Sequence, residues 1–127
     1  MKPNKNIKRD EFILNKILEN QKELSGGVKE FKITQPSDLS NINPFFRRGM
    51  IQTVGDIFEL TTALSDNTLI ELDWDTSLVK VFRNNIVHNY GRVNDAVAYA
   101  WIDYCISKEI VTKVKNTLIK VQEYNKN

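Results

Sequence analysis

Apolar residues recur every three or four positions over most of this chain, which is the spacing of amphipathic helices. Residues 9–24 show this spacing first, with the stripe Phe12, Ile13, Ile17, Leu18 and Leu24. The Ser25-Gly26-Gly27 sequence predicts the end of that helix, because glycine is common just past helix C-termini. Residues 1–8 are polar and predict a flexible tail.

Residues 28–42 fit no single element. Apolar and polar residues alternate over 28–33 as in a strand, but a lone strand has nothing to pair with. We therefore expect a loop, with a helical turn near Pro36 to Leu39.

Asn43-Pro44 is a helix start signal, because asparagine caps helices and proline suits the first helical position. The helix is expected to run to about Leu64, where Ser65-Asp66-Asn67 breaks the chain. Gly49 and Gly55 lie inside it. Glycine costs a helix about 1 kcal/mol relative to alanine, so we expect both glycines to allow close packing against a neighbouring helix.

Two further helices are predicted in the second half of the chain. Asp75-Thr76 can cap a helix from Ser77 to about Tyr90, which Gly91 ends. Asn94 caps the last and longest pattern, which is either continuous or interrupted at Ser107-Lys108. The prediction is an all-α, antiparallel bundle of four or five helices, with residues 1–127 forming one domain.

Charge and composition argue against several kinds of binding and metal site. The chain has 18 Lys and Arg against 16 Asp and Glu, a net charge of +2, whereas strong non-specific nucleic-acid binders carry a large basic excess. One cysteine, Cys105, and one histidine cannot build an internal disulfide or a zinc site, so we expect chemistry without metal or cofactor. With no secretory signal and no apolar run of membrane length, we expect a cytoplasmic protein without membrane contact.

The segment from Arg83 to Tyr90 interrupts the pattern of its own helix. At about 100° per residue, Arg83 falls within the apolar arc between Val79 and Val87. An arginine there must be paired or face a second surface, and Asp56 is one candidate partner. His88 falls on another side of the helix, so either the helix unwinds before Gly91 or another subunit completes a common cleft.

These residue types suit RNA cleavage, which requires a base, an acid and positive charge on the phosphate. Histidine can act as base or acid near neutral pH, and arginine matches phosphate geometry. One histidine fills one role at a time, so a two-fold homodimer with an interface site is a natural hypothesis. The alternative is that Arg83 and His88 only pack against neighbouring residues or interact with solvent, without catalysis.

The order Arg83-Asn84, three residues, His88, one residue, Tyr90 resembles the signature of HEPN domains, and more narrowly the HepT-type toxins of HEPN/nucleotidyltransferase pairs. The resemblance extends loosely to the 9–24 helix, to residues 52–56 and to the helix after Gly91. Asp56 departs from the Gly-Glu pair common in the family. Residues 28–42 show no match.

The resemblance implies a homodimeric helical bundle that acts as a metal-independent endoribonuclease toxin. It further implies a cognate nucleotidyltransferase (MNT-type) antitoxin, which in some systems adenylylates the motif tyrosine. Carried over, Arg83 would bind the scissile phosphate and His88 would be the acid or base. Asn84 would orient the RNA, and Tyr90 would contact it and be a possible adenylylation site.

Arg47 and Arg48 allow two interpretations. Arg47 and Arg48 could bind substrate in a phosphate-tracking patch with Lys80, Arg83 and Arg92, or belong to a solvated helix face. Trp74 and Trp101 could stack on bases, but we expect them to be core or loop-anchoring residues. The rival function is a non-catalytic HEPN module that docks a nucleotidyltransferase or presents its substrate, and a third reading has Arg83 serving only an interface.

Overall fold

The computed structural model describes residues 5–75, 77–89 and 93–126, and it describes no side chains for 5–7 or 85–89. Within these ranges the protein is all-α, without strands, as predicted. Besides the 3-10 helix η1 (Pro36–Ser40), the elements are α1 (Lys5–Glu30), α2 (Pro44–Thr62), α3 (Asp66–Leu72), α4 (Ser77–Asn89), α5 (Asp95–Ile106) and α6 (Lys108–Asn125).

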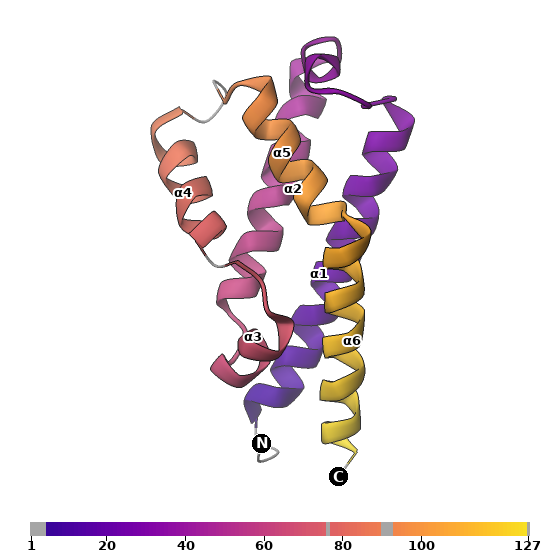
Figure 1. The fold of residues 1–127 in the computed structure, drawn as a ribbon, viewed down its shortest axis with the longest axis vertical. Helices are drawn as coiled ribbons and strands as arrows, with labels where there is room; N and C mark the ends of the chain where they lie inside the picture. Colours follow the sequence, from indigo (N-terminus) through magenta and orange to yellow (C-terminus); the bar gives the residue numbers. More distant parts are fainter. Residues whose placement is uncertain (1–4, 76, 90–92, 127) are drawn as a thin grey trace.

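The longer helices pack in an antiparallel bundle (Figure 1). Helix α1 runs alongside α2 and α6, and both termini lie at the same end of the molecule. Helix α4 lies on the far side of α2 and α5 from α1. None of the helices in the described ranges is long and apolar enough to span a membrane.

The prediction for the end of the first helix was wrong. Helix α1 continues through Ser25-Gly26-Gly27 to Glu30, and residues 5–8, predicted as tail, already belong to it. It ends where Lys32 adopts a left-handed backbone (φ 54°) and the Ile33 N–H donates to the Val28 carbonyl at 2.9 Å. This bond is typical of a Schellman cap. Because Ile33 is buried, the cap forms beside it rather than at the glycines. The turn predicted near Pro36 is present as η1, within an otherwise non-strand segment.

Two predicted boundaries are confirmed, and the possible break at Ser107-Lys108 is present. The Asn43 side chain accepts from the Phe45 N–H at 2.8 Å at the start of α2, and the Asn94 side chain accepts from the Val97 N–H at 2.9 Å at the start of α5. Ser107 separates α5 from α6, and its hydroxyl accepts from the Ile110 N–H. In the predicted Asp75-Thr76 cap, Asp75 accepts from the Ser77 N–H, while Thr76 lies outside the described residues.

Helix α3 was not predicted, because its start depends on a residue far away in the sequence. The Asp10 carboxylate on α1 is 1% exposed and accepts from the Ser65 N–H at 3.0 Å and the Thr68 hydroxyl at 2.5 Å. These bonds occupy polar groups of the first turn that a helix otherwise leaves without partners.

A cluster of aromatic rings joins α4 to the rest of the bundle. The ring of Phe82 lies 5.3 Å from that of Phe58 on α2 and 4.8 Å from that of Trp101 on α5, between ring centroids. Trp74 and Trp101 are both buried, as predicted. Gly55 lies directly against Phe82, which confirms the expected close packing there. At Gly49 the same prediction was wrong, because open space surrounds that position.

Candidate functional site

Arg83 is paired with a carboxylate, but Glu59 is the partner and not Asp56. The Arg83 Nε donates to Glu59 Oε1 at 2.8 Å, and Nη2 donates to Oε2 at 2.9 Å. This two-point geometry holds the planar guanidinium in a fixed orientation. Both side chains remain about half exposed, at 51% and 59%, so the pair does not seal the arginine from solvent.

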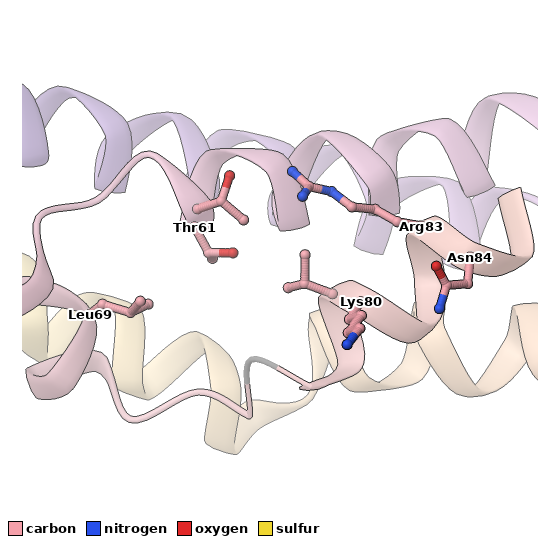
Figure 2. A pocket seen from close by; sticks show the side chains of 7 residues that line it. Thr61, Leu69, Lys80, Arg83 and Asn84 are labelled. Atoms are coloured by element: carbon pink, nitrogen blue, oxygen red, sulfur yellow. The ribbon is translucent and has the colours of Figure 1, made fainter. Parts of the chain in front are cut away.

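A pocket of about 330 Å³ lies beside this pair. Figure 2 shows Arg83 reaching along α2 toward Thr61, while Lys80 and Asn84 point away from α2. The pocket is lined from α2, α3 and α4 by Thr61, Thr62, Leu69, Val79, Lys80, Arg83 and Asn84. Two of these side chains, Lys80 and Arg83, are cationic and, among the described lining residues, none is acidic. The charge of Arg83 is offset by Glu59, which lies just outside the lining.

The structure places His88 only through its backbone. Helix α4 is continuous from Ser77 to Asn89, so position 88 belongs to the same helix as Arg83. The sequence left open that the helix unwinds before Gly91, and the structure shows it to be intact at least through Asn89. Regular geometry puts positions 83 and 88 about 7.5 Å apart along the axis and about 140° apart around it. The His88 side chain, Tyr90, Gly91 and Arg92 lie outside the described residues.

Arg47 lies away from the pocket and has its own partners. Its Nη2 donates to Asp95 Oδ1 at 2.9 Å and to the Val93 carbonyl at 2.5 Å, and its side chain is 15% exposed. The Ser40 hydroxyl, and then Arg47, lower the pKa of Asp95. Arg47 thus connects the start of α5 to α2. Arg48 is exposed, and it does not line the pocket.

The predicted residues therefore fall into separate groups. Arg83 and Asn84 share one pocket, with Lys80 from the predicted patch. Arg47 lies twelve positions before Glu59 on α2, about 18 Å away along that helix. Glu59 was not singled out from the sequence, although it lies one helical turn beyond Asp56, the partner considered there. Burial raises the pKa of Asp56.

In the part of the chain with described side chains, no three His, Cys, Asp or Glu residues are grouped so as to hold a metal ion. Burial raises the pKa of the Cys105 thiol to about 12, as expected of a structural cysteine.

Comparisons with protein-family models, with curated proteins and with solved structures give no significant match.

Proposed function

We propose that this chain is a HepT-like, metal-independent endoribonuclease toxin that cuts RNA in a cleft between two copies of itself. The observation that carries the proposal is the setting of Arg83. It is half exposed, fixed by Glu59 and beside a pocket whose described lining includes no acidic side chain, and it shares one continuous helix with position 88.

The chemistry is an internal displacement at phosphorus. A base removes the proton of the ribose 2′-hydroxyl, and the 2′-oxygen forms a bond to phosphorus as the bond to the 5′-oxygen breaks. The leaving oxygen takes a proton, and the products are a 2′,3′-cyclic phosphate and a 5′-hydroxyl. His88 is the proton acceptor or donor. Arg83 stabilises the added negative charge on the phosphate.

Helix geometry supports placing the cleft between two copies. Positions 83 and 88 lie about 140° apart around α4, so one helix does not direct both toward a single phosphate. A two-fold axis beside α4 would pair Arg83 of one copy with His88 of the other, and would also supply two histidines for the two proton transfers.

The proposed partner is a nucleotidyltransferase antitoxin that adenylylates Tyr90. Positions 83 and 90 are seven residues apart, so they share a helical face within about 20° if α4 geometry continues to Tyr90. The phosphodiester added to Tyr90 would bring negative charge toward Arg83 and block the path of RNA.

A second function has one observation in its favour. Arg83 already has a carboxylate partner, so the ion pair accounts for this arginine without any catalysis. In that case the chain is a non-catalytic HEPN module that docks a nucleotidyltransferase or presents its substrate.

The test is RNA cleavage by the purified protein in EDTA, with His88→Ala and the neighbouring Asn89→Ala as a matched control. Both variants are compared with wild type for helicity and association state. We expect wild type and Asn89→Ala to cut and His88→Ala not to cut. Equal cleavage by all three, or by none, would reject the ribonuclease and favour the docking module.

A further inference from the structure

A second pocket, of about 530 Å³, lies between α1 and the joint of α5 and α6. Helix α4 is on the other side of the bundle, so this pocket is separate from the proposed ribonuclease site (Figure 1). Its lining residues are Leu18, Gln21, Lys22, Ser25, Gly26, Lys29, Ile106, Val111 and Lys115. Its volume is within the range of small-molecule sites in proteins.

The charged residues described in the lining of this pocket are all basic. Lys22, Lys29 and Lys115 line it, all three are exposed and, among the described residues of the lining, none is acidic. A lining with three lysines and, among its described residues, no acidic side chain suits a multiply charged anion such as a phosphate group better than a single carboxylate. Leu18, Ile106 and Val111 are half-buried and give the same pocket an apolar wall.

Gln21 adds a polar group to the wall. It is 2% exposed, and its Nε2 donates to the Cys105 carbonyl at 2.9 Å, which fixes the amide. Its buried Oε1 accepts no hydrogen bond from the described part of the chain. This oxygen has almost no accessible surface and is out of reach of a ligand in the pocket, so Gln21 supports the pocket wall through its bond to α5.

Gly26 is a lining residue of the pocket that lies within a helix. It lies inside α1, where glycine is the least favourable residue after proline, yet a Cβ atom there would meet nothing within 4 Å. Packing inside the chain therefore does not require glycine at this position. A glycine lining a pocket allows another molecule to approach the helix backbone closely.

We infer that this pocket binds a phosphate ester with an apolar body, its phosphate among the three lysines and its body against Leu18, Ile106 and Val111. A nucleotide and an alkyl phosphate of the lipid type both have this chemistry. The inference does not depend on RNA cleavage.

The test titrates the whole protein with inorganic phosphate, adenosine monophosphate and decyl phosphate by calorimetry. We expect one of the two esters to bind one-to-one, and at least about tenfold more tightly than inorganic phosphate. The reason is that binding transfers the apolar surface of the ester from water to the pocket wall. The tighter ester identifies the source as nucleotide or lipid-like. If neither ester binds more tightly than inorganic phosphate, the inference is wrong.

Two matched pairs of variants locate the binding. Lys22→Glu should weaken the better ester about tenfold or more, whereas the same change at Lys8, which is exposed on α1 outside the pocket, should not. Gly26→Leu should block the pocket, whereas Gly49→Leu, at an equally open helical glycine on α2, should bind like wild type. A folded Gly26→Leu protein that still binds the ester would place the site elsewhere and overturn the inference. All these readouts are independent of cleavage, so failure here and failure of the proposed ribonuclease are distinguishable.

Discussion

Glu59 holds the guanidinium of Arg83 edge-on through two parallel hydrogen bonds between α2 and α4. The arginine singled out by the sequence motif is therefore held in a fixed orientation by the fold itself. Since the pair is half exposed, water screens it, and its orienting effect is larger than its contribution to stability.

Separate removal of the two partners tests this distinction. Arg83→Ala and Glu59→Ala should each change the free energy of unfolding by about 1 kcal/mol or less. RNA cleavage should be abolished in Arg83→Ala, because the positive charge on the phosphate is then lost, and only reduced in Glu59→Ala, where the arginine keeps its charge but loses its fixed orientation. Thermal unfolding and a cleavage assay check both points. Equal loss of activity in the two variants would instead assign the arginine to the ion pair.

The two glycines of α2 should respond oppositely to alanine. A Cβ atom at Gly55 would lie 3.0 Å from the Phe82 ring, which Phe58 and Trp101 hold in place, so Gly55→Ala should destabilise by about 1–3 kcal/mol. Gly49→Ala meets nothing and should stabilise by up to about 1 kcal/mol. Urea unfolding of both variants measures the difference, and a stabilising Gly55→Ala would show that the ring can move.

The Asp10 carboxylate should be necessary for α3. Asp10→Ala removes a buried acceptor from the Ser65 N–H and the Thr68 hydroxyl, at an expected cost of about 2–3 kcal/mol. Asp66→Ala is the matched control, because Asp66 lies exposed in the first turn of α3 and should cost about 1 kcal/mol or less. Chemical denaturation compares the two, and similar losses would contradict the special role of Asp10.

The bonds of Asp95 predict a pH dependence of stability. The Ser40 hydroxyl, and after it Arg47, lower the pKa of Asp95 in the folded protein from 3.8. A lowered carboxyl pKa stabilises the fold above the unfolded value, and this contribution disappears as the pH falls through the folded value.

Wild type should therefore exceed Asp95→Asn in unfolding free energy by about 1 kcal/mol at neutral pH. The difference should shrink below pH 3.8. Thermal unfolding across this range is the measurement. A difference that does not change with pH would show that the Asp95 charge is not the cause.

Local signals explain which parts of the fold were predictable. Asn43 and Asn94 mark helix starts with their own side chains, and Ser107 marks the break between α5 and α6 in the same way. Helix α3 was missed because its cap comes from Asp10, 55 positions earlier in the chain. The end of α1 was missed because burial of Ile33, which is a tertiary contact, moves the cap beyond the glycines.

The candidate site, like the fold, could be predicted only in part from the sequence. Helical periodicity showed that Arg83 needs a partner, but Asp56 and Glu59 are one turn apart on the same helix. The rotation of α2 against α4 decides between them, and contacts such as that of Gly55 with Phe82 set this rotation. Arg47 could not be assigned from sequence, since its partners Val93 and Asp95 lie 46 and 48 positions further along the chain.

The bond from Arg47 to the Val93 carbonyl also attaches the chain after α4 to α2. Ring packing at Phe82 secures α4 on one side of position 88, and this bond secures the chain soon after the helix, on the other side. Helix α2 thus provides the partners of both Val93 and Arg83, which are Arg47 and Glu59. A displacement of α2 would therefore disturb both contacts together.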